Sequence, residues 1–252
     1  MDVLWELAEK INQIDGVDAS LYLKELIEKE KSGLITTEEI IELLKKHYGE
    51  KMNDIYTDKN TGVFINKLGI TDPELLREAE ADIVIVRLKE ILESKDFKYG
   101  YEPYLNLHQQ MFQDIYPFAG ELRKIDMQKS ERILSWFPMI FGEKSQVSKK
   151  LKKVFKEKEI NFEESKEEIV AQLVDFMSSI WEIHPFREGN TRSIITYTIK
   201  YIRHNGLKID KDLLLENFAY IRDALVMSVY QEPKYLEKIL LDSIERGMKL
   251  WN

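Results

Sequence analysis

The sequence predicts an all-α fold that carries one small β-hairpin, and three observations lead to this prediction. Apolar residues recur at intervals of three and four along most of the chain, which places them on one face of a helix. Residues that start or stop helices, among them Ser, Thr, Asp-Pro and Gly, stand at the ends of these periodic segments. Alternation of apolar and polar residues, which is typical of a strand, appears around residues 125–136.

The composition excludes several classes of protein. The 252 residues are 44% hydrophobic, which is ample for a buried core, and the 11 Gly and 6 Pro residues argue against disorder. The net charge of -8 disfavours a general nucleic-acid binder. There are no cysteines, so disulfides and thiolate metal sites are excluded. The four histidines are scattered along the chain and give no support to a zinc site.

The sequence also suggests where the protein works. No apolar run approaches the length of a membrane span, and the N-terminus lacks the basic start of a signal peptide. We therefore expect a cytoplasmic protein with no membrane partner. The oligomeric state stays open, and a homo-oligomer is one of the alternatives.

Three short helices are predicted at the N-terminus, over residues 1–14, 19–31 and from Thr36 or Thr37 onward. This small unit has too little core to be stable alone, so we expect it to pack on the rest of the chain. A polar, turn-rich stretch follows it. We therefore divide the chain into an N-terminal helical unit, residues 1–54, and a core domain, residues 55–252.

Helical periodicity continues through the core domain. The predicted helices outside the central motif cover residues 72–94, 104–115, 138–157, 210–230 and 232–250. His108 lies on the second of these among apolar neighbours, and we interpret it as a packed side chain. The lysine-rich run at residues 149–153 is interpreted as a solvated helix face, because acidic residues follow directly.

The hairpin is predicted over residues 124–136. Ile125 and Met127 alternate with Lys124 and Asp126, residues 128–131 can turn, and the chain can return as a second strand. A lone two-stranded hairpin is only marginally stable unless it packs on something. Its exposed edge would suit main-chain pairing with an extended segment of a target protein.

A nine-residue loop, here called the motif loop, separates two apolar helical segments. It consists of His184, Pro185, Phe186, Arg187, Glu188, Gly189, Asn190, Thr191 and Arg192. Pro185 disfavours helical geometry in the residue before it, so the first helix should end there. Gly189 can adopt a positive φ, and Asn190 or Thr191 can cap a second helix over residues 193–204.

The chemistry of these residue types points to phosphate transfer. A loop that leads into a helix N-terminus offers free N–H groups to phosphate, and Arg192 adds further donors. Glu188 is a ligand of the kind that Mg²⁺ takes alongside substrate phosphates. His184 can act as a base near neutral pH. Each residue alone has a structural explanation, since His-Pro can simply end a helix, but their combination favours function.

In this order the motif loop resembles the signature of the Fic family, His-x-Phe-x-Asp/Glu-Gly-Asn with an Arg two residues after the Asn. Residues 56–70 and 116–123 resemble two further Fic segments, the second of which leads into a β-hairpin called the flap. The N-terminal helices resemble antitoxin modules that accompany some Fic proteins. The resemblance implies a Fic-type helical core with a flap and a short N-terminal helical unit.

The resemblance also implies an activity. Fic proteins are mostly nucleotidyltransferases that move AMP from ATP to a hydroxyl side chain, so the implied partner is a protein that offers a Ser, Thr or Tyr. This protein could also be a copy of the chain itself, which would then be self-modified. His184 would take the proton of the hydroxyl, and Glu188 would hold Mg²⁺. The target would dock on the flap, at Lys124, Ile125, Asp126 and Met127.

The same resemblance gives roles to the end of the motif loop. Gly189 and Asn190 would bind the α-phosphate, Thr191 belongs to the same nucleotide-binding segment, and Arg192 would hold the β-phosphate. Phosphoryl-type transfers depend mainly on positioning and charge stabilisation, which such a cradle provides. Phe186 would anchor the loop in the core.

Three positions depart from the family pattern. Many family members have Gly where this chain has Thr191. Ile195 takes the place of a second Arg, and Asp15 takes the place of the glutamate that pairs with that Arg in an inhibitory helix. We therefore expect autoinhibition through Asp15 to be weak or absent. Three alternatives stay open: a nucleotide-binding module with little or no transfer that acts through a partner, the use of another nucleotide or phosphate donor, and a metal-dependent hydrolase, which would need more ligands.

Overall fold

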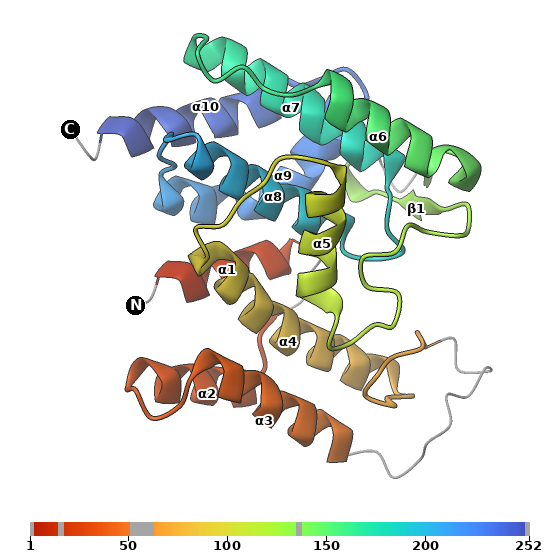
Figure 1. The fold of residues 1–252 in the computed structure, drawn as a ribbon, viewed down its shortest axis with the longest axis vertical. Coiled ribbons are helices and arrows are strands. Elements are labelled where there is room, and N and C mark those ends of the chain that lie inside the picture. Colours follow the sequence, from red (N-terminus) through yellow and green to blue (C-terminus); the bar gives the residue numbers. More distant parts are fainter. Residues whose placement is uncertain (1–2, 15–17, 51–62, 135–137, 250–252) are drawn as a thin grey trace. The chain divides into compact units, whose positions relative to one another are not determined.

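The computed structural model describes residues 3–14, 18–50, 63–134 and 138–249. These residues form ten α-helices, two short 3-10 helices and a two-stranded antiparallel sheet (Figure 1), which confirms the all-α fold with one small hairpin. The chain forms two compact units, Met1–Ser94 with Leu107–Gly120, and Lys95–Asn106 with Glu121–Asn252. The boundary expected between residues 54 and 55, and Asp15, lie outside the described residues.

The first unit is built around one long helix. Its helices are α1 (Val3–Gln13), α2 (Leu21–Lys31), α3 (Thr37–Glu50), α4 (Pro73–Glu93) and the second half of α5 (Tyr101–Phe112). Both α1 and α3 pack on α4, which is buried on nearly all sides. The predicted helix starts are confirmed, because Ser20 caps α2 and Asp72 caps α4, each through a side-chain oxygen that accepts a backbone N–H.

A half-buried group of three charges joins α3 and α4 to the segment after α5. The Asp114 carboxylate accepts a hydrogen bond from Arg87 Nε at 2.6 Å and lies 2.9 Å from Lys45 Nζ. Burial alone would raise the pKa of Asp114, but the hydrogen bonds from Arg87 and Lys45 outweigh it and lower that pKa below its ordinary value. The folded state therefore favours the ionised carboxylate.

This group makes the stability of the first unit sensitive to acid. Because the pKa of Asp114 is lowered by folding, its contribution is fully present above the ordinary value of about 3.9 and is lost as the pH falls through the folded value. We expect Asp114→Asn to lower the free energy of unfolding at pH 7 by about 1.5–3 kcal/mol, with a smaller difference at pH 3. Urea unfolding at both pH values measures this.

The matched control is the exposed pair on the same helix. Glu74 and Arg77 lie 3.5 Å apart on the first turns of α4, and both side chains are mostly exposed to solvent. Exposed pairs contribute little, so Glu74→Gln should change the free energy of unfolding by less than about 0.5 kcal/mol. An Asp114→Asn protein as stable as the wild type at pH 7 would contradict the assignment.

The second unit holds the hairpin and the remaining helices. Its elements are the first half of α5, β1 (Gln128–Ser130), β2 (Pro138–Ile140), 3-10 turns at Arg132–Leu134 and Lys144–Gln146, α6 (Val147–Glu157), α7 (Lys166–Ile183), α8 (Asn190–His204), α9 (Lys211–Val229) and α10 (Lys234–Lys249). The central helix is α7, which contacts α6, α8, α9 and α10 (Figure 1). The two C-terminal helices match their predicted ranges closely.

An aromatic cluster supports the motif loop from inside this unit. Tyr104 of α5, Phe155 of α6 and Tyr197 of α8 lie with ring centroids 5.3–5.8 Å apart. Phe186 of the motif loop joins them, 5.5 Å from Tyr104, and is fully buried. Aromatic pairs at these separations add to the stabilisation from burial, so Phe186 anchors the loop as expected.

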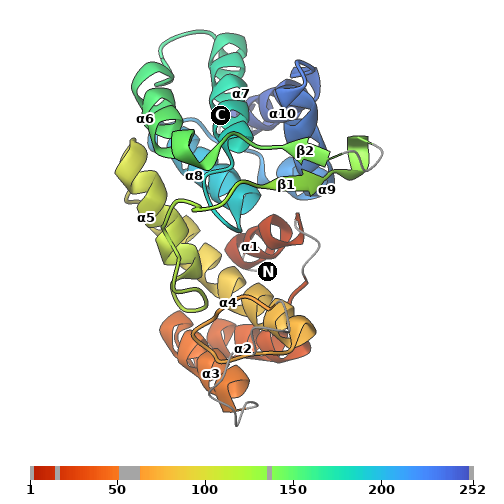
Figure 2. The same ribbon diagram turned by 90° about the vertical axis from the view of Figure 1, so that its right-hand side faces the viewer.

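The positions of the predicted strands are wrong. The strands pair Gln128 with Ile140 and Ser130 with Pro138 (Figure 2), whereas residues 124–127 precede the first strand and residues 132–134 form a 3-10 turn. The predicted helix at 138–157 is also wrong at its start, because it begins only at Val147. Pro138 lacks an N–H and suits the first residue of a strand.

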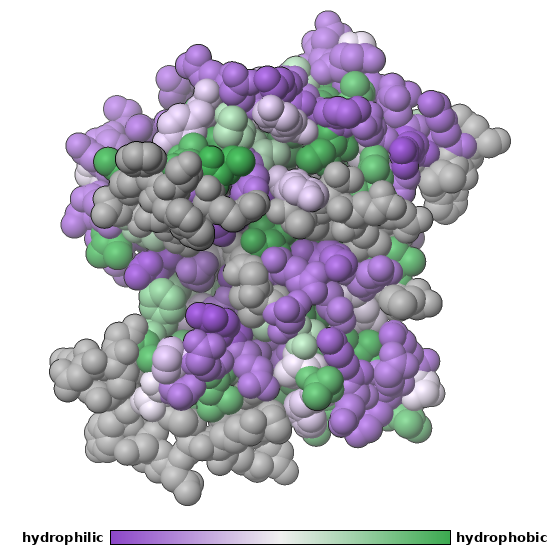
Figure 3. Space-filling view, turned by 180° about the vertical axis from the view of Figure 1, so that it is seen from behind, coloured by the Kyte–Doolittle hydropathy of each residue, from purple (hydrophilic) through white to green (hydrophobic). Residues whose placement is uncertain are grey.

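The surface seen from behind is mostly hydrophilic, and apolar side chains appear on it in separate small areas (Figure 3). This distribution follows from the amphipathic helices, whose apolar residues point inward. The lysine run of α6 behaves as predicted, because Lys149, Lys150, Lys152 and Lys153 are all exposed. Across the described residues, every helix is too short or too polar to cross a membrane.

Candidate functional site

The motif loop begins where α7 ends, at a residue in an unusual conformation. His184 follows the last helical residue and has φ 49° and ψ 63°, the left-handed region. Its backbone nitrogen donates to the carbonyls of Ile180 and Trp181, both at 3.1 Å, which closes the last turn. The prediction that Pro185 ends the helix is confirmed.

The irregular segment after α7 ends at Gly189, which has φ 75°, so the last three residues of the motif loop belong to α8. The predicted cap by Asn190 or Thr191 is wrong, because both residues already belong to the helix. The Asn190 side chain instead accepts from the nitrogen of Phe186 and donates to its carbonyl, both at 2.9 Å. The Thr191 hydroxyl accepts from Trp181 Nε1 at 3.2 Å. These two side chains therefore hold the loop closed.

The start of α8 combines two features that suit an anion, a helix N-terminus and a buried guanidinium. Its cap residue is Gly189, which makes no side-chain hydrogen bond to the first turn, and the N–H groups at the start of a helix point toward the place where an anion binds. Arg192 lies in that first turn and is only 1% exposed. Its Nη2 atom lies 3.7 Å from Glu188 Oε1, which also accepts from the nitrogen of Gly189 at 3.0 Å.

Glu188 and Arg192 therefore face each other across the beginning of the helix. A partly exposed carboxylate and a buried guanidinium at this point can hold opposite parts of a metal–phosphate ligand. The described residues contain no group of three or more His, Cys, Asp and Glu side chains that could hold a metal ion. A Mg²⁺ ion bound by Glu188 would therefore have to take its other ligands from substrate phosphates and water, which it commonly does.

The imidazole of His184 is covered. Its ring stacks on Phe141 with centroids 3.7 Å apart, and the Trp181 ring lies nearly perpendicular to it, with centroids 5.7 Å apart. Only 2% of the residue is exposed to solvent. Phe141 follows β2 directly, so the segment that ends the hairpin lies over the residue predicted to act as the base.

The four predicted flap residues do not share one environment. Lys124 is exposed and pairs with Glu121, and Ile125 is 46% exposed. Asp126 accepts from the backbone nitrogen of Lys144 at 2.7 Å, whereas Met127 is buried. They lead into the hairpin rather than form its first strand.

Ile195 and His108 are both buried and pack within the protein. Ile195 is buried and lines a small apolar cavity together with Met177 and Leu236. An apolar position of this kind contributes no charge to a phosphate site. His108 is buried as predicted, and its Nδ1 atom accepts from the backbone nitrogen of Gly120 at 2.8 Å.

The structure adds residues that the sequence did not reveal. Phe141 covers His184, and the Arg123 guanidinium is buried beside the carbonyls at the end of α7. Glu131, near the tip of the hairpin, is buried and accepts two hydrogen bonds from Arg222 of α9, at 2.9 and 3.1 Å. These contacts join residues 43 to 91 positions apart, so no local spacing could have indicated them.

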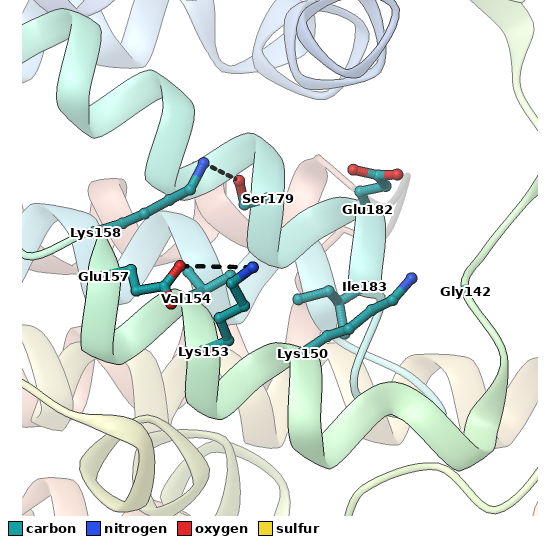
Figure 4. A pocket seen from close by; sticks show the side chains of 9 residues that line it. All are labelled: Gly142, Lys150, Lys153, Val154, Glu157, Lys158, Ser179, Glu182 and Ile183. Carbon is teal, nitrogen blue, oxygen red and sulfur yellow. Dashed lines mark hydrogen bonds and ion pairs between the residues drawn. The ribbon is translucent and has the colours of Figure 1, made fainter.

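A pocket of about 320 Å³ lies between α6 and α7 (Figure 4). Three lysines line it, but Lys153 pairs with Glu157, and Lys158 donates to Ser179 within the pocket and to Asp175 beside it. The third, Lys150, extends toward Gly142. Most of the positive charge of this pocket is therefore already paired with side chains of the protein.

Comparison with known proteins points to one family. A model of the Fic/DOC family matches residues 99–201. The protein adenylyltransferase VbhT of Bartonella schoenbuchensis is 28% identical over 170 residues, 67% of this chain and 34% of that protein. The probable protein adenylyltransferase y4lH of Sinorhizobium fredii is 30% identical over 154 residues, 61% of this chain and 78% of that protein. The chain thus spans about a third of the first relative.

Solved structures share the fold at lower sequence identity. The BepC protein of Bartonella tribocorum, solved with bound AMPPNP, is similar with a TM-score of 0.60 at 19% identity, over 75% of this chain and 95% of that chain. A Fic family protein from Desulfovibrio desulfuricans is similar with a TM-score of 0.53 at 12% identity, over 99% of this chain and 75% of that one. These similarities concern the fold alone.

Proposed function

This chain belongs to the Fic/DOC family, and from that premise we propose that it is a protein adenylyltransferase, which transfers AMP from ATP to a hydroxyl side chain of a protein. Two relatives support the proposal, of which one is named a protein adenylyltransferase and the other a probable protein adenylyltransferase. The observation that carries it is the start of α8, where a helix N-terminus, a buried Arg192 and the facing carboxylate of Glu188 meet.

The nucleotide would bind at this helix start. The N–H groups after Gly189 would donate to the α-phosphate, and Arg192 would hold the β-phosphate. The Asn190 side chain is engaged within the loop, so its contribution to the phosphate would come from its backbone. Glu188 would release Arg192 and hold Mg²⁺, whose positive charge offsets that of the phosphates. Charge stabilisation of this kind is the main source of rate in phosphoryl-type transfer.

His184 would act as the general base. In the proposed reaction its imidazole takes the proton of the target hydroxyl, and the oxygen forms a bond to the α-phosphorus. The bond from that phosphorus to the bridging oxygen breaks, and pyrophosphate leaves. Because the Nε2 atom of the ring is buried, the residues that cover it must move before a hydroxyl reaches it.

The hairpin would hold the target. Two of its apolar side chains face solvent, Ile140 at 76% and Ile133 at 42% exposure, and the strands are only three residues long. An extended segment of a target could add to its edge by main-chain hydrogen bonds and cover these side chains. The target and the modified residue type follow from what this edge accepts.

The proposal is tested by comparing ATP labelled at two different phosphates. The purified chain, with Mg²⁺, is incubated with ATP labelled at the α-phosphate or at the γ-phosphate, alone and with cell lysate. Kinases of the lysate also transfer the γ-phosphate, so each sample is compared with lysate alone. Above that background we expect protein-bound label from α-labelled ATP and none from γ-labelled ATP, because the α-phosphorus is transferred and pyrophosphate leaves. Label from the γ-position above the background would instead indicate a phosphotransferase and would overturn the proposal.

A second function, nucleotide binding without transfer, is favoured by one observation. The predicted base is covered by Phe141, so a site that never opens would hold ATP and act through a partner. Calorimetric titration of Mg-ATP separates the two functions. Binding with no transfer of either label, alone or in lysate, would support this second function.

A further inference from the structure

Arg123 connects the motif loop to both ends of the hairpin. Its guanidinium, which is completely buried, donates to four backbone carbonyls. The acceptors are His184 at 2.8 Å, Ile183 at 3.3 Å, Ile125 at 2.6 Å and Gly142. Two of these carbonyls end α7, one precedes β1 and one follows β2. A single side chain therefore ties the hairpin to the residue proposed as the base.

The backbone of Arg123 adds a further contact to the same loop. Its nitrogen donates to the carbonyl of Pro185 at 2.8 Å. The carbonyls of three successive residues, 183 to 185, are thus all bound by Arg123. Planar guanidinium groups present several donors in a fixed geometry, which a lysine ammonium group does not reproduce.

The residue in the middle of these three is strained. His184 has a positive φ without being glycine, a conformation that costs about 1–3 kcal/mol and persists only where its surroundings enforce it. Arg123 supplies that enforcement, since it binds the His184 carbonyl and both neighbouring carbonyls. The last carbonyls of a helix also carry partial negative charge, which favours a cation at this place.

Arg123 also controls what covers His184. Gly142, whose carbonyl it binds, follows Phe141 directly, and Phe141 stacks on the His184 ring. The carboxylate nearest to its guanidinium among the described residues is that of Asp126, at 3.9 Å, so carbonyl groups are its main partners. Both the backbone and the ring face of His184 therefore depend on this side chain.

We propose that Arg123 is a positioning residue, which fixes the orientation of the His184 imidazole and its distance from the hairpin. Its catalytic consequence rests on the proposed AMP transfer, whereas its effect on the His184 ring does not. Removal of the guanidinium should let the end of α7 relax from the left-handed conformation and let Phe141 leave the imidazole. The base would then be present but misplaced.

Three variants distinguish two roles of Arg123, positioning of the His184 ring and simple attachment of the hairpin. Arg123→Met removes all of the side-chain donors at similar length, and Arg123→Lys keeps the charge but not the planar geometry. Arg222→Met is the control, because it breaks the other tie of the hairpin, to Glu131, without touching the motif loop. Proton NMR of the histidine ring, with the His184 signal assigned by loss in His184→Gln, reports the stacking on Phe141.

In the wild type we expect the His184 ring protons to be shifted upfield by the Phe141 ring. Arg123→Met should move them toward the position of an exposed histidine, Arg123→Lys should give an intermediate shift, and Arg222→Met should leave them in place. Transfer from α-labelled ATP should fall about 10²-fold in Arg123→Met, through kcat, with an unchanged Kd for Mg-ATP.

An unmoved His184 signal in Arg123→Met, or an equal shift in Arg222→Met, would overturn the proposal. If circular dichroism shows that Arg123→Met is unfolded, Arg123→Lys decides, and an unchanged signal there counts against positioning. If the wild type transfers no label, the proposed activity fails while the NMR comparison still decides the role of Arg123. The two failures are thus distinguishable.

Discussion

Replacing His184 with alanine is expected to lower the rate of AMP transfer by about 10²- to 10⁴-fold, which is the usual contribution of a positioned general base. The residue stands at the junction of the hairpin and the motif loop, and its left-handed backbone directs the ring toward Phe141. The phosphate-binding groups belong to residues 188–192 and are left in place. The loss should therefore appear in kcat, measured as incorporation of α-label, while Mg-ATP still binds.

The control for this variant is the surface histidine of the same unit. His204 is exposed in the last turn of α8, so His204→Ala should transfer label at the wild-type rate. His184→Ala also removes a buried ring, and circular dichroism with Mg-ATP titration shows whether the site is still formed. Full transfer by a folded, nucleotide-binding His184→Ala protein would exclude the residue as the base.

The replacement of Gly247 with alanine is expected to destabilise the protein. This residue lies within α10, where an alanine would ordinarily favour the helix by about 1 kcal/mol. A Cβ atom at this position would lie 2.7 Å from the backbone nitrogen of Asp210, which is closer than real contacts allow. That backbone is held in place, because the Asp210 nitrogen donates to the backbone carbonyl of Ser243 at 2.8 Å.

The steric clash of the added Cβ atom should therefore outweigh the helix propensity of alanine and lower the free energy of unfolding. Overpacking of a rigid site typically costs about 1–3 kcal/mol, so urea unfolding should show a lower midpoint for Gly247→Ala despite the better helix propensity. Gly142→Ala is the matched control, because the nearest atom to its Cβ is the flexible end of Lys150 at 3.4 Å. It should be neutral or slightly stabilising. A Gly247→Ala protein that is more stable than the wild type would contradict the close packing of α10.

Most helices could be predicted because their signals are local. Ser20 and Asp72 precede apolar periodic segments, and each accepts the hydrogen bond expected of a cap. Pro185 and Gly189 set the ends of the motif loop through their own backbone preferences, so the end of α7 and the positive φ of Gly189 followed from the sequence. Helix α8 begins three residues earlier than predicted, since Asn190 braces the loop instead of capping the helix.

The hairpin and the cover of the site could not be predicted, because long-range contacts decide them. The alternation of Ile125 and Met127 suggested a strand, but Arg123 binds the carbonyl of Ile125, and the strand begins only at Gln128. Nothing near Phe141 in the sequence indicates that it stacks on a histidine 43 residues away. The roles of the motif residues toward nucleotide and target stay proposals. The labelling experiment tests the transferred group, and the alanine variant tests the role of His184.

The two compact units alternate along the chain, and this governs which fragments can be used. Along the sequence, Met1–Ser94 belongs to the first unit, Lys95–Asn106 to the second, Leu107–Gly120 to the first again and Glu121–Asn252 to the second. No single cleavage or stop codon can therefore release either unit whole. A protein shortened to residues 55–252 would lose α1 and α3, which pack on α4, and one that starts at residue 121 would lose the Tyr104 ring behind Phe186.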